Sequence, residues 1–299
     1  MVNSELALQE NKHPNKEAEK RYDLLIGIDE QKNELLKTLS LLMDGDKVSL
    51  WEKHHHKKGL PLMQHIDTGT PLIILSGEVG CGKTALAQVI GTPLGRKLGK
   101  NVKVFETPSN IRGSGLVGEI SNRITDAFES AKAKLKDDEV GILIIDEADD
   151  IATSRAQNQA HHEDRAGLNV LIKQIDSIKR ANKKLAVIMI TNRVVVLDPA
   201  IRRRTALHLI FDRPVGEKLD EVLIWILDGT QYSDGQFKKL KTAISKQKVP
   251  YSFSDLIQRA GRQAVFEAIE SNLAFDILLF TEILEKTEPT PLIEEQKLN

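Results

Sequence analysis

Residues Leu72 to Leu86 read L-I-I-L-S-G-E-V-G-C-G-K-T-A-L, and the rest of the predicted fold follows from them. The apolar run from Leu72 to Leu75 has no polar alternation, which predicts a strand buried on both faces. A glycine-rich loop follows the strand, and the helix-forming residues T-A-L-A-Q-V-I follow the loop. Strand, glycine loop and helix in this order favour a parallel α/β fold with a phosphate-binding loop.

The loop from Gly77 to Thr84 fits the pattern G-x-x-x-x-G-K-T, in which each fixed residue has a task. Glycines let backbone N–H groups wrap a phosphate, the Lys83 ammonium reaches the β and γ oxygens, and the Thr84 hydroxyl ligates Mg²⁺. The alternative, a glycine-rich turn with an incidental lysine, is disfavoured by the strand and helix on either side. The sequence therefore assigns nucleotide binding to Glu78, Val79, Gly80, Cys81, Gly82, Lys83, Thr84 and Ala85.

The composition is that of a soluble globular protein, because 40% of the 299 residues are hydrophobic and 28% are charged. Lysine and arginine number 42 against 43 aspartates and glutamates, so no overall field directs the chain to nucleic acid or to an anionic membrane. Cys81 is the only cysteine, which excludes an intrachain disulfide and fits a reducing compartment. The sequence has no apolar run long enough for a membrane span or a signal peptide, so we expect a cytoplasmic protein.

A second chemical feature is G-I-L-I-I-D-E, from Gly141 to Glu147. Its apolar residues again predict a buried parallel strand, with Asp146 and Glu147 at the carboxyl end. Ligands of open α/β sheets bind at this edge. We expect Asp146 to hold Mg²⁺ through water and Glu147 to act as general base on the attacking water. A D-E pair alone is a weak signal, and the buried strand and the upstream G-K-T loop strengthen it.

Two further features lie downstream. The apolar strand from Leu185 to Ile190 leads into Asn192, whose side chain either positions the attacking water or caps a turn. The segment D-P-A-I-R-R-R then brings Arg203 and Arg204. These arginines form either a solvated basic turn or a guanidinium donated to the γ-phosphate of a neighbouring subunit, a task that needs a planar cation of fixed charge.

The sequence predicts four segments: a flexible polar arm over residues 1–20, a nucleotide-binding α/β domain over 21–215, an α-helical lid domain over 216–286 and a polar tail over 287–299. The lid is predicted because this region shows helical periodicity and no strand pattern. The basic stretch from Trp51 to Gly59 reads as a solvated loop, because its three adjacent histidines match no metal-ligand spacing.

In their order along the chain, I-G-I-D-E-Q-K at Ile26 to Lys32, the G-K-T loop, I-I-D-E, T-N and D-P-A-I-R-R-R resemble the AAA+ ATPases. The resemblance covers the chain from about Tyr22 to the end of the lid. It implies a five-stranded parallel sheet of strand order 5-1-4-3-2 flanked by helices, and a small helical lid, with ATP and Mg²⁺ held between the two. It also implies a ring, usually a homo-hexamer, because an arginine of the next subunit completes each site.

The motifs of that family fall on residues of this chain that match them one by one. The matches are Gly77, Gly80, Gly82, Lys83 and Thr84 for Walker A, Asp146 and Glu147 for Walker B, Asn192 for sensor 1, Arg203 and Arg204 for the arginine finger, and Ile26 and Gly27 for the adenine pocket. Leu116 and Val117 match the pore loop that grips a polypeptide, although Leu116 replaces the usual aromatic residue. Ser254 stands where the sensor 2 arginine is usual, so no sensor 2 role is assigned.

One stretch narrows the resemblance, because L-I-K-Q-I-D-S-I-K-R at Leu171 to Arg180 is similar to the pachytene-checkpoint branch. Members of that branch unfold the HORMA domains of partner proteins. Bacterial relatives act in cyclic-oligonucleotide antiphage systems, where they disassemble an activated HORMA–nucleotidyltransferase complex. The resemblance thus implies a remodeler of a HORMA-domain protein, in a short form without the N-terminal adaptor domain.

The alternative function is a loader or regulatory AAA+ ATPase that acts on a nucleic-acid complex. The neutral net charge and the apolar pore loop argue against it. An inactive scaffold is disfavoured because every hydrolytic position is filled. A P-loop kinase is disfavoured by the arginine-finger segment and the helical lid.

Overall fold

The computed structural model describes residues 7–63, 70–108, 111, 118–153, 162–178 and 184–293. These residues form two compact units. The first consists of the described residues within Met1–Leu24, Glu30–Ser76 and Thr84–Ile210, and the second of those within Leu25–Asp29, Gly77–Lys83 and Phe211–Asn299. The phosphate-loop residues 77–83 therefore group with the C-terminal helices. The domain bounds suggested by the sequence stay a prediction.

The first unit is built on a six-stranded sheet of order β1-β3-β4-β5-β2-β6. The strands are β1 (Gln9–His13), β2 (Leu72–Gly77), β3 (Val102–Glu106), β4 (Val140–Ile145), β5 (Lys184–Thr191) and β6 (Thr205–Phe211). Strands β2 to β6 form the five-stranded parallel sheet that the sequence predicts, and their order is confirmed. All of β4 and nearly all of β2 and β5 are buried, as in a sheet that is covered on both faces.

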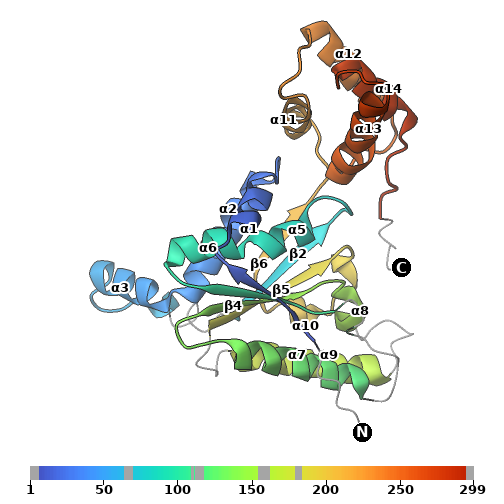
Figure 1. The fold of residues 1–299 in the computed structure, drawn as a ribbon. Coiled ribbons are helices and arrows are strands. Elements are labelled where there is room, and N and C mark those ends of the chain that lie inside the picture. Colours follow the sequence, from blue (N-terminus) through green and yellow to red (C-terminus); the bar gives the residue numbers. More distant parts are fainter. Residues whose placement is uncertain are drawn as a thin grey trace. The chain divides into compact units, whose positions relative to one another are not determined.

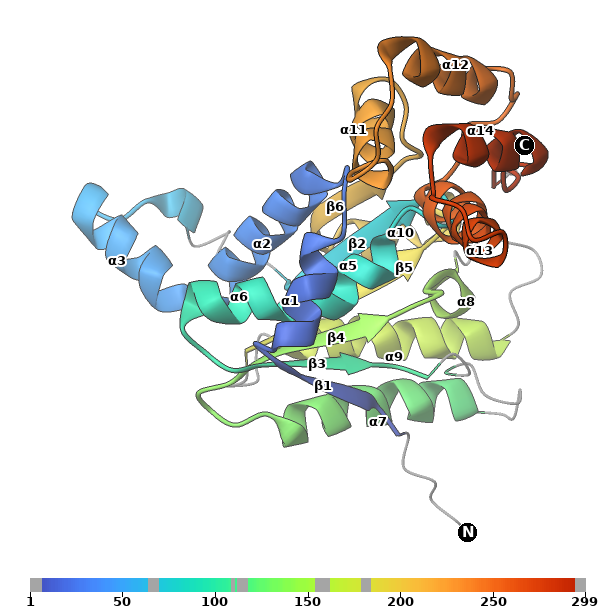
Figure 2. The same cartoon turned by 45° about the horizontal axis from the view of Figure 1, so that its top comes forward.

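Helices cover both faces of this sheet. In both views α7 and α9 lie side by side on one face, and α1 and α6 lie on the other (Figures 1 and 2). Phe128 of α7 and Leu171 of α9 are fully buried in the core that these helices share with the strands. Helices of this unit include α1 (Lys16–Asp23), α2 (Asp29–Met43), α3 (Gly45–His55), α5 (Lys83–Val89), α6 (Gly91–Leu98), α7 (Glu119–Lys134), α8 (Asp149–Ala152), α9 (His162–Ile178), the 3₁₀ turn η1 (Val194–Val196) and α10 (Pro199–Arg202).

The prediction of a flexible arm over residues 1–20 is wrong from Gln9 onward. Strand β1 pairs antiparallel with β3, and α1 follows, with the Asn15 side chain accepting a hydrogen bond from the Ala18 N–H at 2.8 Å. His13 is 4% exposed, and its Nδ1 lies 2.8 Å from Thr92 Oγ1. Burial lowers the pKa of His13 to about 4, so this histidine is neutral at physiological pH. This strand lies at the sheet edge and is polar, so it has no hydrophobic pattern from which a strand could be predicted.

The basic stretch from Trp51 to Gly59 is also not a loop throughout, because α3 continues to His55. The Asp44 side chain caps this helix by accepting from the Lys47 N–H at 3.2 Å. The Trp51 ring packs at a tilt against the His56 ring, with centroids 5.2 Å apart. No residue of α3 is buried, so the helix has no apolar stripe from which periodicity could predict it.

The second unit is helical beyond Phe211, as the sequence predicts. Its helices include α11 (Glu217–Ile226), α12 (Asp234–Ser245), the π-helical turn η2 (Asp255–Gly261), α13 (Arg262–Glu270) and α14 (Ile277–Lys286). Their core contains the fully buried side chains of Leu223, Leu240, Leu256 and Phe280. Among the described residues of either unit, no helix has the length and apolarity that a membrane crossing requires.

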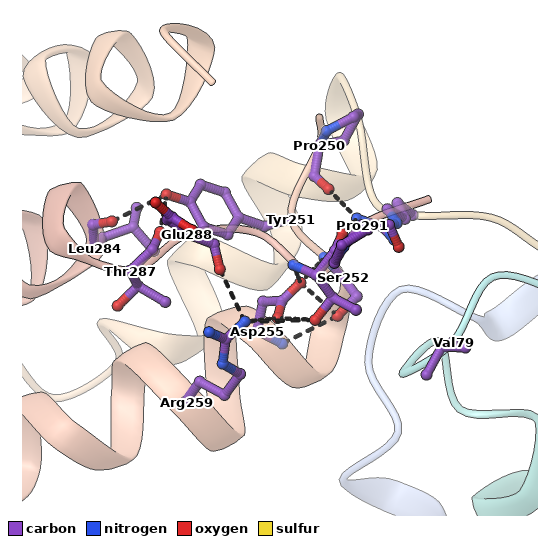
Figure 3. Close-up of polar contacts among 12 residues, drawn as sticks. Val79, Pro250, Tyr251, Ser252, Asp255, Arg259, Leu284, Thr287, Glu288 and Pro291 are labelled. Atoms are coloured by element: carbon purple, nitrogen blue, oxygen red, sulfur yellow. Dashed lines mark hydrogen bonds and ion pairs between the residues drawn. The ribbon is translucent and has the colours of Figure 1, made fainter. Parts of the chain in front are cut away.

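The start of the predicted polar tail is bound to this unit, and we call the segment Thr287–Pro291 the C-terminal strap. The Tyr251 hydroxyl lies 2.8 Å from the carbonyl oxygen of Thr287, and Arg259 Nη1 donates to the carbonyl of Glu288 at 2.8 Å (Figure 3). The first two backbone carbonyls of the strap thus have side-chain partners from the segment that precedes α13.

Asp255 is the buried anchor of the strap. Its carboxylate accepts from the Thr290 hydroxyl at 2.7 Å and N–H at 3.2 Å, from the Ser252 hydroxyl at 2.9 Å and from Arg259 at 2.6 Å. Burial raises the pKa of this carboxyl, but the hydrogen bonds from Thr290, Ser252 and Arg259 outweigh burial and lower the pKa of Asp255 to about 2. The anchor is therefore ionised at neutral pH and binds the strap through charge-assisted hydrogen bonds.

Candidate functional site

The phosphate loop has a backbone that only glycine adopts easily. Gly77, Gly80 and Gly82 have φ angles of 119°, 72° and 92°. A Cβ atom at Gly77 would lie 2.3 Å from the carbonyl oxygen of Phe211, and one at Gly80 would lie 2.8 Å from the Cβ of Ser254. The loop is therefore packed closely within the second unit at two of its glycines.

Lys83 is buried at the base of this loop, with 5% of its surface exposed. Its Nζ donates to the carbonyl oxygens of Gly77 at 2.8 Å and Glu78 at 2.6 Å. These bonds hold the ammonium inside the curve of the backbone, where it can meet the oxygens of a phosphate. Of the other loop residues, Val79 is 43% exposed, and Ala85 lies half-buried in the first turn of α5.

Thr84 and Asp146, the two predicted Mg²⁺ ligands, are in direct contact in the first unit. The Thr84 hydroxyl donates to Asp146 Oδ2 at 2.8 Å. Hydroxyl and carboxylate oxygens suit Mg²⁺, which proteins bind through one or two such groups together with the phosphates of a substrate. In the described residues no three His, Cys, Asp or Glu side chains gather as an all-protein metal site.

Glu147, the predicted general base, follows Asp146 in a strained backbone conformation. Its φ is +51°, which is uncommon for a residue with a side chain. Its N–H donates to Asp146 Oδ1 at 2.8 Å, so the same carboxylate holds the Glu147 backbone and the Thr84 hydroxyl. The Glu147 side chain is exposed. Residues with such an uncommon backbone conformation cluster at functional sites, where the surrounding structure maintains them.

Asn192, the predicted sensor 1 residue, follows β5 at the same edge of the sheet and is exposed. The Thr191 hydroxyl before it donates to Asp149 Oδ1 at 2.8 Å, and the Arg193 N–H after it donates to Thr191 Oγ1 at 2.9 Å. Asp149, at the start of α8, thus fixes the turn that carries Asn192.

The predicted adenine-pocket residues Ile26 and Gly27 lie in the second unit. Ile26 packs on the helical core of that unit. Gly27 has φ +75°, and a Cβ there would lie 2.9 Å from the Phe253 ring. The next residue, Ile28, is buried, and its Cδ1 lies 3.5 Å from a Cβ built at Gly82. An apolar segment therefore adjoins the phosphate loop, as an adenine ring would require.

The two candidate finger arginines differ in their contacts. Arg204 makes a two-point ion pair with Asp176 of α9, through Nε at 2.9 Å and Nη2 at 3.1 Å, and its Nη1 donates to the Ala200 carbonyl at 3.0 Å. The hydrogen bonds to Asp176 raise the pKa of Arg204 above its ordinary value. Within the described residues the exposed Arg203 makes only a hydrogen bond of 3.3 Å from Nε to the Pro199 carbonyl.

Sequence reasoning missed Arg213, which binds the phosphate-loop residue Glu78. Arg213 is 5% exposed, and its Nε and Nη2 donate to Glu78 Oε2 at 3.0 and 2.8 Å. No spacing rule connects residues that are 135 positions apart. Reasoning also missed the lid contact at Gly80, whose carbonyl oxygen accepts from the Ser254 N–H at 3.0 Å. A backbone donor makes this contact, so the identity of residue 254 gives no signal for it.

Burial raises the pKa of Cys81 to about 11, so its thiol is protonated at neutral pH and is a poor nucleophile. The predicted pore-loop residues Leu116 and Val117 lie outside the described residues, and their role stays a prediction.

Each unit holds parts that phosphoryl chemistry needs. The second unit has a backbone cradle with a buried lysine, and the first has a hydroxyl–carboxylate pair suited to Mg²⁺ and, next in the chain, the exposed Glu147. Asn192 follows β5, which pairs with both β2 and β4, so it comes from the sheet edge that also carries Asp146.

Comparison with known families and curated proteins agrees with this geometry. Residues 73–213 match the family described as ATPase family associated with various cellular activities (AAA). Over 284 residues the chain is 34% identical to CD-NTase-associated protein 6 of Escherichia coli strain KTE188, and the match covers 94% of this chain and 95% of the relative.

Solved structures show the same likeness. A chain in the HORMA:CdnC:Trip13 complex of E. coli MS115-1 superposes with a TM-score of 0.87 and 33% identity, covering 96% of this chain and 97% of that one. Trip13 from Rhizobiales superposes with a TM-score of 0.72 and 30% identity, covering 95% and 98% of the two chains.

The close packing of Gly80 gives a test with a matched control. Gly80→Ala and Gly229→Ala both place a side chain at positive φ, +72° and +79°, which costs about 1 kcal/mol of folding free energy. Only Gly80 has neighbours within 4 Å of the added carbon. We expect denaturant unfolding to show a further loss of about 1–3 kcal/mol for Gly80→Ala, and calorimetry to show ADP binding at least about tenfold weaker than in Gly229→Ala. Equal stability and equal affinity in the two variants would contradict the packing described here.

Proposed function

Because the chain belongs to the AAA ATPase family, in the group of CD-NTase-associated protein 6, we propose that it hydrolyses ATP to disassemble a complex of a HORMA-domain protein and a nucleotidyltransferase. In this role it switches off the nucleotidyltransferase of a cyclic-oligonucleotide antiphage system. Of the two functions that the sequence leaves open, the relatives favour this one over the loading of a nucleic-acid complex.

ATP hydrolysis is carried by one observation, the contact of Thr84 with Asp146 next to the exposed carboxylate of Glu147. Thr84 and Asp146 would hold Mg²⁺, which supplies charge neutralisation at the β- and γ-phosphates when bound. Lys83 binds the same phosphates from the loop that directly precedes Thr84 in the chain.

Glu147 then acts as the general base. Its carboxylate takes a proton from the attacking water while Asn192 orients that water from the end of β5. The carboxylate of Asp146 is already engaged by the Thr84 hydroxyl and the Glu147 N–H, so it is the less suited of the two acids for this step. The positive φ of Glu147 turns its side chain away from the path that a regular strand would give it.

We propose Arg203 as the finger that reaches the γ-phosphate of a neighbouring copy. A finger must leave its own subunit, and among the described residues the exposed side chain of Arg203 has one long hydrogen bond, of 3.3 Å, to give up. Arg204 is fastened to Asp176 and Ala200, so its proposed task is to hold the segment that presents Arg203. This arrangement requires a ring of subunits, and we propose a homo-hexamer in the cytoplasm.

The proposed partner rests on the likeness to the Trip13 chains. The solved complex that resembles this chain contains HORMA and CdnC together with Trip13, and the likeness extends over nearly the whole length of both chains. We propose that this chain engages a HORMA-domain protein by its pore loop at Leu116 and Val117, which would draw in a flexible end of the substrate.

The base assignment is tested with Glu147→Gln, which keeps the shape of the side chain and removes its basicity. We expect unchanged ATP binding and a fall in turnover of at least about 100-fold, because general-base catalysis contributes 10²–10⁴-fold. Turnover is measured as phosphate release, and affinity by calorimetry. The ATP-bound variant should also retain the HORMA–nucleotidyltransferase complex in a pull-down. Wild-type turnover in Glu147→Gln would refute the assignment.

The two arginines are tested with Arg203→Ala, Arg204→Ala and Asp176→Asn. We expect Arg203→Ala to lower ATP turnover by about 10³-fold with unchanged stability, because a finger acts only on the transition state. Arg204→Ala and Asp176→Asn should each lose about 0.5–1 kcal/mol of unfolding free energy, since each removes the same half-exposed ion pair. The assignment fails when Arg203→Ala turns over ATP at the wild-type rate.

A further inference from the structure

We propose that Arg213 and Glu78 are positioning residues that join the C-terminal strap to the phosphate loop, so that nucleotide binding and strap order stabilise each other. The inference rests on the proposed nucleotide binding by that loop. It adds a regulatory contact that involves residues 287–291, which lie beyond the last helix of the lid.

Arg213 uses its whole guanidinium for this connection. Nε and Nη2 donate to Glu78 Oε2, at 3.0 and 2.8 Å. Nη1 donates to the carbonyls of Pro250 at 2.7 Å and Thr290 at 2.6 Å, and Nη2 also donates to the carbonyl of Pro291 at 2.8 Å. The five N–H groups of the side chain are matched by these five contacts.

The burial of Arg213 makes these bonds hard to exchange for water. Only 3% of the side-chain surface is exposed, against 21% for Glu78. When the strap leaves, the donors that face Thr290 and Pro291 stay buried without partners, which is unfavourable for a charged group. The ordered strap and the Arg213–Glu78 pair therefore stabilise each other, and removing the strap leaves a buried charge with unpaired donors.

On the loop side, Glu78 connects this pair to the phosphate-binding lysine. Its backbone N–H donates to the Phe211 carbonyl at 2.9 Å, and its own carbonyl accepts from Lys83 Nζ at 2.6 Å. One residue thus carries the carboxylate that binds Arg213 and the carbonyl that holds Lys83. A displacement of Glu78 would move the ammonium that meets the phosphates.

A second route joins the strap to the same loop through Asp255. This carboxylate accepts from the Thr290 N–H and hydroxyl, and also from the Ser252 N–H at 3.0 Å and hydroxyl at 2.9 Å (Figure 3). The Ser252 hydroxyl oxygen lies 2.9 Å from a Cβ built at Gly80, and the Ser254 N–H donates to the Gly80 carbonyl. Thr290 is therefore connected to two residues of the loop, to Glu78 through Arg213 and to Gly80 through Asp255 and Ser252.

Coupling between nucleotide binding and strap order is reciprocal. If the ordered strap raises the affinity of the loop for a nucleotide by some factor, the bound nucleotide raises the equilibrium constant for strap ordering by the same factor. A bond network that merely fastens the end of the chain would not respond to nucleotide. This difference separates the proposed coupling from a purely structural role.

The first measurement is hydrogen exchange of the Thr290 amide, which donates to Asp255, in the full chain with and without saturating ADP. We expect ADP to slow exchange at Thr290 by about tenfold or more. Equal exchange rates with and without ADP would overturn the proposal.

Variants then test the two ends of the network. Arg213→Lys keeps the positive charge and loses the planar guanidinium that donates in several directions. We expect ADP to bind this variant about tenfold more weakly and to give no added protection at Thr290.

Thr290→Val removes one hydrogen bond to Asp255, and we expect ADP binding about threefold weaker. The matched control is Thr281→Val in α14. Within the part of the chain that the structure describes, the Thr281 hydroxyl donates only to the Ile277 carbonyl, so its loss should leave ADP affinity unchanged.

Glu78→Gln keeps the proposal testable when Arg213→Lys does not fold, because it leaves the bonds from Arg213 to the strap in place. In that variant we expect normal exchange at Thr290 without ADP and no further slowing with ADP, together with a raised KM for ATP. Wild-type KM and wild-type ADP protection would refute the coupling. A wild-type chain that fails to bind ADP at all would refute the proposed function instead.

Discussion

The hydrogen bond from the Thr84 hydroxyl to the Asp146 carboxylate is the contact on which the candidate site depends. It spans the end of β5, which lies between β2 and β4 in the sheet. The bond forms only when the first turn of α5 and the end of β4 meet at one edge, and the parallel order of the buried strands enforces that meeting. The same carboxylate then fixes the backbone of Glu147, so the proposed Mg²⁺ ligands and the proposed base depend on one side chain.

Much of the sheet and of the candidate site could be predicted from the sequence, because the residues that form them carry local signals. The apolar runs before Gly77 and Asp146 identify buried parallel strands, and the loop and acidic pair at their ends then have to share an edge. The glycines of the loop could also be predicted, because the backbone at Gly77 and Gly80 leaves no room for a side chain.

The features that could not be predicted lack such signals. Strand β1 is polar because it lies at an edge, and α3 has no buried face, so neither shows a hydrophobic period. Arg213 binds three backbone carbonyls and one carboxylate from distant parts of the chain. Because every residue has a backbone carbonyl, the sequence does not indicate which carbonyls accept these bonds. The different contacts of Arg203 and Arg204, on which their proposed tasks rest, likewise depend on Asp176, which only the fold brings beside Arg204.

We propose that ATP hydrolysis at this site separates a HORMA-domain protein from its nucleotidyltransferase. The most direct test follows cyclic-oligonucleotide synthesis by the preassembled HORMA–nucleotidyltransferase complex after the chain and ATP are added. We expect synthesis to fall as the complex comes apart, and a non-hydrolysable ATP analogue to abolish the fall. Undiminished synthesis by an intact complex, while the chain turns over ATP in the same reaction, would contradict it.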